Sequence, residues 1–118
     1  MTEDLSPFLP LSPATLHILL ALASEDRHGY GIMQEVARQS EGQYKLGPGT
    51  LYDNLEKLMN LAMVEETPRP SPNEDSRRRY YRLTGLGRRT LSAEIARLDT
   101  VVREARLRLR VPSPRRAS

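Results

Sequence analysis

The chain has 118 residues, no cysteine and a formal net charge of +3. This length is enough for one domain with a modest core, and the lack of cysteine excludes disulfides and thiolate chemistry. With two histidines and no recognisable ligand spacing, we expect neither a metal site nor a cofactor. The apolar segment 16–23 is too short to span a bilayer, and no basic region with an apolar run opens the chain. We therefore expect a soluble cytoplasmic protein without a membrane anchor.

Charge is distributed very unevenly along the chain. Residues 1–68 hold four basic and ten acidic side chains, whereas residues 69–118 hold fourteen basic and five acidic ones. Such an asymmetry indicates that the second half faces a polyanion, either nucleic acid or an anionic surface. A merely solvated basic surface is the alternative.

The first predicted helix is apolar on nearly all sides. Residues 1–11 form a short proline-containing arm, after which Ser12 and Pro13 fit the N-cap and first position of a helix. Almost every residue from 16 to 23 is apolar, so this helix needs a second covering surface besides its own core.

Two further helices follow a polar connector at residues 24–28. One begins at Gly29 and ends near residue 39, and the other covers residues 48–62, with Pro48 suited to the first helical turn. The apolar positions of the later helix recur at helical spacing, namely Leu51, Leu55, Leu58 and Ala62. Its polar N-terminal face suits insertion into a DNA groove, although a plain surface helix would show the same pattern. Two short helices joined by a brief turn are typical of a helix-turn-helix.

A β-hairpin, or wing, is predicted next. Residues 63–67 and 77–83 read as two strands around an exposed, proline-rich loop. In the second strand, alternation places one set of side chains on each face: Arg79, Tyr81 and Leu83 on one, and Arg78, Tyr80 and Arg82 on the other.

The last helix, capped by Thr84, bears a coiled-coil seam at 4-3-4-3-4 spacing, namely Leu91, Ile95, Leu98, Val102, Ala105 and Leu109. Charged residues surround it, namely Glu94, Arg97, Asp99, Arg103, Glu104 and Arg106. A helix of about 25 residues spans about 37 Å, more than one small domain covers. We therefore predict a homodimer with Leu16, Leu20 and the seam in its interface; burial against the chain's own domain is the alternative.

Three segments together resemble a known family. They are His28-Gly29-Tyr30-Gly31-Ile32, then Gly49-Thr50-Leu51-Tyr52 with Leu55 and Leu58, then Arg79-Tyr80-Tyr81-Arg82-Leu83-Thr84 followed by Gly87. In this order and spacing they resemble the PadR-type transcriptional regulators, in the short branch with a single C-terminal helix. The resemblance implies a homodimeric DNA-binding repressor, often released by a small-molecule effector.

The fold expected is mainly α with a small β-hairpin: a winged helix-turn-helix followed by one long dimerisation helix. Residues 1–84 would form the DNA-binding domain with its arm, residues 85–110 the dimerisation helix, and residues 111–118 a basic, disordered tail. Two features of the sequence are unfavourable for DNA binding. The wing loop is acidic at residues 73–75, and the predicted recognition helix carries Asp53 and Glu56, which repel phosphate unless they face bases or solvent.

The predicted partner is double-stranded DNA. We expect Thr50, Tyr52 and Lys57 to contact it in the major groove, and the wing to hold its phosphates through Arg77, Arg78, Arg79 and Arg82. Tyr30 is expected to pack between helices, with a phosphate contact through its hydroxyl as the alternative. An effector would lie where the first helix meets the partner's last helix. The alternative function is a winged-helix module that binds protein and no DNA. An enzyme is not expected, because the sequence shows no nucleophile–base pair, paired carboxylates or phosphate loop.

Overall fold

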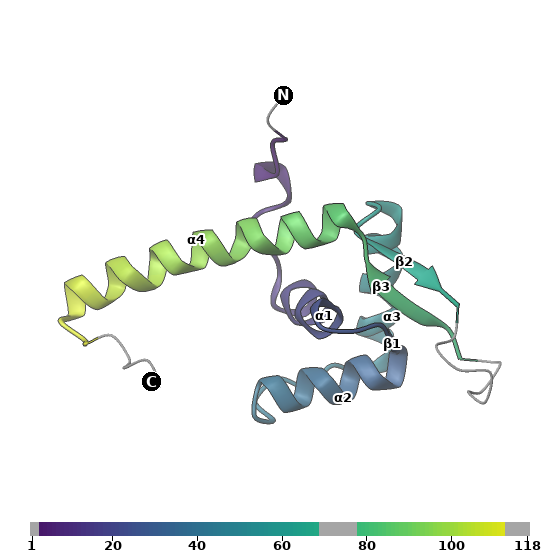
Figure 1. The fold of residues 1–118 in the computed structure, drawn as a ribbon. Coiled ribbons are helices and arrows are strands. Elements are labelled where there is room, and N and C mark those ends of the chain that lie inside the picture. Colours follow the sequence, from purple (N-terminus) through teal and green to yellow (C-terminus); the bar gives the residue numbers. More distant parts are fainter. Residues whose placement is uncertain (1–2, 69–77, 113–118) are drawn as a thin grey trace.

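The computed structural model describes residues 3–68 and 78–112, so Arg77, loop residues 73–75 and tail residues 113–118 lie outside the described residues. Within these ranges the chain is mainly helical, with a small antiparallel sheet and one long C-terminal helix (Figure 1). The elements are the 3-10 helix η1 (Ser6–Phe8), α1 (Pro13–Ala23), β1 (Arg27–His28), α2 (Gly29–Gln39), α3 (Pro48–Asn60), β2 (Val64–Thr67), β3 (Tyr80–Leu83) and α4 (Gly85–Leu109). Their order confirms the predicted winged helix-turn-helix with one long last helix.

The predicted helix starts are confirmed by their caps. The Ser12 hydroxyl accepts a hydrogen bond from the Thr15 N–H at 3.2 Å and opens α1. The Thr84 hydroxyl does the same for the N–H of Gly87 at 3.1 Å and opens α4. Pro48 occupies the first turn of α3, where its missing N–H leaves no bond unmade.

The sheet has three strands in the order β1-β3-β2, so the prediction of a two-stranded hairpin was incomplete. Arg27 and His28, predicted as part of a polar connector, form β1 and pair antiparallel with Tyr81 and Tyr80 of β3. β2 pairs with the other edge of β3. Two residues are too few to show the alternation of apolar and polar side chains that identifies a strand in a sequence. Only the pairing with β3 defines β1.

Side chains on both faces of β3 are buried. Tyr81 belongs to the core and is 3% exposed, while Tyr80 on the opposite face is 6% exposed. The rings of Tyr80 and His28 are nearly perpendicular, with a centroid distance of 5.2 Å. Of the strand's polar side chains, Arg82 is the one that reaches solvent.

The core lies between α1, α2, α3 and the sheet, centred on Ile18, Leu19, Leu22, Ile32, Leu51 and Leu55. The predicted stripe of α3 is confirmed at its first three positions but wrong at Ala62, which is exposed and follows the end of the helix. The N–H groups of Ala62 and Met63 bond the carbonyls of Met59 and Leu58 at 3.0 and 2.9 Å. This closure places Ala62 at a φ of 60°, the left-handed residue of a Schellman motif.

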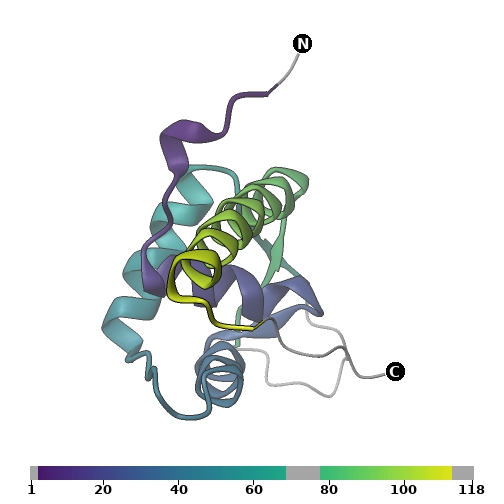
Figure 2. The same cartoon turned by 90° about the vertical axis from the view of Figure 1, so that its left-hand side faces the viewer.

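Helix α4 runs over α1 and extends well beyond the domain (Figures 1 and 2). Of the predicted seam, Leu91 is buried in its own domain and Leu98 is half-buried. The other members are exposed: Ile95, Val102 and Leu109 at 39%, 46% and 73%, and Ala105. Leu16 and Leu20 on α1 are half-buried. One chain thus leaves most of the seam uncovered, and the dimer contact stays a prediction.

No helix in the described ranges is long and apolar enough to cross a membrane.

Glu94 was predicted among the surface charges of α4, and this is wrong, because its side chain is 1% exposed. One carboxylate oxygen accepts the backbone N–H of Leu11 at 2.8 Å, and the other accepts the Arg97 guanidinium at 2.5 Å. These bonds lower the pKa of Glu94, with Arg97 contributing most, against a desolvation that raises it. The buried carboxylate therefore joins the N-terminal arm to α4.

Replacing Glu94 with Gln should lower the free energy of unfolding at neutral pH by about 1–3 kcal/mol, because a charge-assisted acceptor is lost. A pKa depressed in the folded state makes its contribution complete above the unfolded pKa of about 4.3 and lost as pH falls through the folded value. The difference between wild type and variant in urea unfolding should therefore shrink as pH falls below about 5. Glu104→Gln, in the exposed pair with Arg108, is the control and should change little. A difference independent of pH would contradict this role.

Candidate functional site

A cleft of about 400 Å³ opens where the start of α2, the first half of α3 and the base of the wing meet. Its lining is polar and aromatic, with two guanidinium groups and three phenols: His28, Gly29, Tyr30, Tyr52, Arg78, Arg79 and Tyr81. We call this the wing cleft. Among the described residues no carboxylate lines it, so this part of the cleft presents mainly hydrogen-bond donors and positive charge, a combination suited to an anion.

His28 fixes the donor pattern on one wall of the wing cleft. Its Nδ1 accepts the N–H of Gly31 at 3.0 Å and caps α2. A neutral imidazole that accepts at Nδ1 carries its proton on Nε2. That nitrogen lies 3.0 Å from Nη1 of Arg78, so the His28 ring and the Arg78 guanidinium stand side by side on this wall.

Tyr52 reaches the wing cleft from α3, and glycine at position 29 makes room for it. A Cβ added at Gly29 would overlap the Tyr52 hydroxyl, so any larger residue there would displace the phenol. Tyr52 is 49% exposed. Beside it, burial raises the pKa of Tyr81, with smaller contributions from Tyr52 and Glu66. The Tyr81 phenol therefore keeps its proton at neutral pH.

Tyr30 was predicted to pack between helices, and this is wrong. Its side chain is 59% exposed and its ring stacks against His28 at a centroid distance of 6.5 Å. The inner face of α2 is occupied instead by Ile32 and Val36, which turns the second residue of the helix outward. The place of Tyr30 in the wing cleft agrees with the alternative, a contact through the hydroxyl. The sequence reasoning did not select the lining residues His28, Gly29 and Tyr81, although all three stand in the segments that carry the family resemblance.

The wing arginines are held by exposed glutamates on the neighbouring strand. Arg79 pairs with Glu66 at 3.3 Å and Arg82 with Glu65 at 2.8 Å. Exposed pairs of this kind contribute little stability, so a phosphate can replace the carboxylate at small cost. Arg78 and Arg79 line the wing cleft, whereas Arg82 does not.

The predicted contact residues of α3 do not form one group. Thr50 and Lys57 are exposed, but neither lines the wing cleft. Lys57 lines a different groove, between α3 and the N-terminal arm. Asp53 and Glu56 are exposed on the same helix. The structure thus brings Tyr52, Arg78 and Arg79 together and leaves the other two α3 candidates outside.

The chain is similar to known transcription regulators. The family model described as "Transcriptional regulator PadR-like family" matches residues 18–93. Transcriptional regulator Rv3488 of Mycobacterium tuberculosis is 34% identical over 89 residues, covering 75% of this chain and 78% of that protein. A PadR-like transcription factor from Bacteroides fragilis is 26% identical with a TM-score of 0.63, covering 77% of this chain and 84% of that one. A PadR family transcription regulator from Clostridium difficile R20291 shares the fold, with a TM-score of 0.70 at 20% identity over 83% of this chain and 99% of that one.

Proposed function

Because the chain belongs to the PadR-like family of transcriptional regulators, we propose that it is a homodimeric DNA-binding repressor of a palindromic operator. Residues 1–84 bind DNA, and residues 85–110 dimerise. A small-molecule effector releases the repressor. The family is one of transcription regulators, which are generally not enzymes.

The wing cleft carries this proposal, because its donors lie directly beside the exposed face of α3. With α3 in the major groove, Thr50, Tyr52 and Lys57 face the DNA, while a backbone phosphate contacts Arg78 at the wing cleft. Phosphate oxygens match guanidinium, imidazole and phenol donors. Arg82, Arg79 and Arg77 of the wing add charge along the adjoining backbone.

Selection of duplex DNA from a random library by the purified full chain tests this function. We expect enrichment of an inverted repeat with half-site centres about 34 Å apart, one helical turn, since a two-fold dimer reads two equal half-sites. A winged-helix module that binds protein alone would enrich nothing. Failure of any sequence to enrich, with folded protein, would refute the proposal.

Replacing Tyr52 with Phe should weaken binding to the selected duplex by about 1–3 kcal/mol while leaving thermal unfolding almost unchanged. The hydroxyl lies in the wing cleft, and Tyr52 is outside the core. Tyr44→Phe is the matched control, because Tyr44 stacks on His17 away from the wing cleft and should bind DNA normally. Fluorescence anisotropy measures both. Equal affinities of the two variants would show that Tyr52 makes no such contact.

A further inference from the structure

The solvent side of α3 carries one line of residues along the helix. They follow one another at spacings of four, three and four residues, namely Gly49, Asp53, Glu56 and Asn60. All four are exposed, and the leucines that α3 gives to the core lie on the opposite side, as helical periodicity requires. Two acidic side chains therefore stand in the middle of the surface that the proposed function places against DNA.

Asp53 is the first side chain on this line. Gly49, one turn earlier, has none, and a Cβ added there would meet nothing within 4 Å. Thr50 and Tyr52 flank Asp53 and are exposed as well, whereas Glu56 lies further along the helix. A recognition helix contacts base edges with its N-terminal residues. The carboxylate of Asp53 is therefore the acidic group of α3 that comes closest to the bases.

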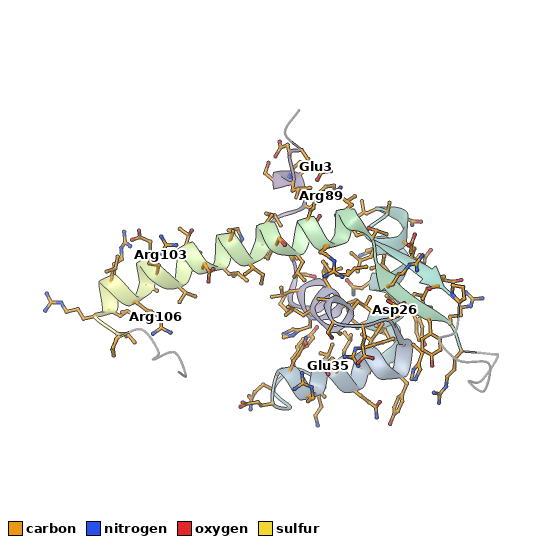
Figure 3. All side chains as sticks on the ribbon, in the orientation of Figure 1. Glu3, Asp26, Glu35, Arg89, Arg103 and Arg106 are labelled. Atoms are coloured by element: carbon orange, nitrogen blue, oxygen red, sulfur yellow. The ribbon has the colours of Figure 1, made fainter. Side chains whose placement is uncertain are left out.

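The carboxylate of Asp53 is available for a contact. Elsewhere on the described surface arginines hold carboxylates in ion pairs: Arg89 pairs with Glu3 at 2.8 Å (Figure 3) and Arg82 with Glu65 at 2.8 Å. Within residues 3–68 and 78–112, by contrast, Asp53 makes no hydrogen bond or ion pair. Its negative charge is thus not balanced by the fold.

The chemistry of a carboxylate limits what it can contact on a duplex. It accepts hydrogen bonds and donates none, so phosphate oxygens and the acceptor atoms of guanine and thymine repel it. The donors in the major groove are the N4 amino group of cytosine and the N6 amino group of adenine. On adenine the acceptor N7 stands beside N6 and opposes the second carboxylate oxygen. Cytosine is therefore the base that an aspartate selects.

We propose that Asp53 reads one cytosine in each half-site of the operator by accepting a hydrogen bond from its N4 amino group. The same carboxylate rejects the other bases at that position, so it gives specificity through repulsion as well as attraction. This inference rests on the proposed function, which assigns α3 to the major groove.

Selection of duplex DNA from a random library, with the wild-type full chain and with Asp53→Asn, tests the assignment. Wild type should require a G·C pair at one position of each half-site. The variant should prefer A·T there, because an asparagine amide pairs with N6 and N7 of adenine, and should keep the other positions. Asp26→Asn is the matched control: Asp26 is exposed in the connector between α1 and β1 (Figure 3), and its variant should select the wild-type sequence.

Anisotropy titrations separate reading from mere repulsion. On the duplex selected by wild type, Asp53→Asn should bind roughly tenfold more weakly for each half-site, since one base contact is lost. On a scrambled duplex it should bind as tightly as wild type or more tightly, because a negative charge facing the DNA is removed. Thermal unfolding should be unchanged, since Asp53 lies outside the core.

Tighter binding of Asp53→Asn to both duplexes, or the same base preference in wild type and Asp53→Asn, would overturn the role of Asp53 and leave the proposed function standing. If wild type enriches no sequence at all, the proposed function fails and this inference fails with it. The two failures are therefore distinguishable.

Discussion

A variant with Asp at both Leu98 and Val102 should be a folded monomer whose affinity for the selected duplex falls by at least roughly a hundredfold, because two linked half-site contacts become one. On a single chain Val102 is 46% exposed and Leu98 is half-buried. A dimer that covers this seam would bury two unpaired carboxylates on each helix, which costs more than the apolar contacts provide. Light-scattering chromatography reports the mass and anisotropy reports the affinity.

The same two charges on the opposite side of α4 provide the control. Ala96 and Thr100 are exposed and lie away from the seam, so Asp at both should leave dimer and affinity nearly unchanged. A wild-type protein that elutes as a monomer at micromolar concentration would contradict the dimer. So would a Leu98/Val102 variant that stays dimeric.

Gly87→Ala should destabilise the domain by roughly 1–3 kcal/mol or more, with a correspondingly lower urea midpoint. A Cβ at this position would overlap the carbonyl oxygen of Met63 and lie 3.2 Å from Cδ2 of Leu83. The start of α4 would have to move off the sheet. That movement would strain the 3.1 Å bond from the Thr84 N–H to the Met63 carbonyl.

Gly85→Ala, two residues earlier in α4, is the control for glycine replacement itself. A Cβ there would meet only the far end of Arg89, at 3.0 Å, which a flexible side chain can relieve. Alanine also has the higher helix propensity, by up to about 1 kcal/mol, so this variant should be as stable as wild type or more stable. Equal destabilisation of both variants would refute the close approach at Gly87.

The sequence predicted those features that local physics decides. Ser12, Thr84 and Pro48 mark helix starts because capping and a missing N–H act within one turn. The spacing of Leu51, Leu55 and Leu58 identifies the buried face of α3 for the same reason, since a single helix sets the period.

Features set by distant partners could not be predicted in this way. Glu94 sits in a charged stretch of α4, and only the Leu11 N–H, 83 residues away, explains its burial. Arg27 and His28 become a strand because β3 lies beside them. Tyr30 faces outward because α2 begins at Gly29 and buries a different face. The wing cleft joins three segments far apart in sequence, so its composition follows from the fold.

The salt dependence of duplex binding tests most directly whether the wing cleft and wing grip the DNA backbone. Anisotropy titrations of the selected duplex and a scrambled one, at several salt concentrations, give the slope of log K against log salt. Replacing Arg78 and Arg79 with Gln should weaken both duplexes and flatten the slope by roughly one unit per lost phosphate contact. Arg103→Gln with Arg110→Gln removes equal charge from exposed positions on or just beyond α4 and should leave the slope unchanged. An unchanged slope in the Arg78/Arg79 variant, or equal flattening in both variants, would contradict a phosphate contact at the wing cleft.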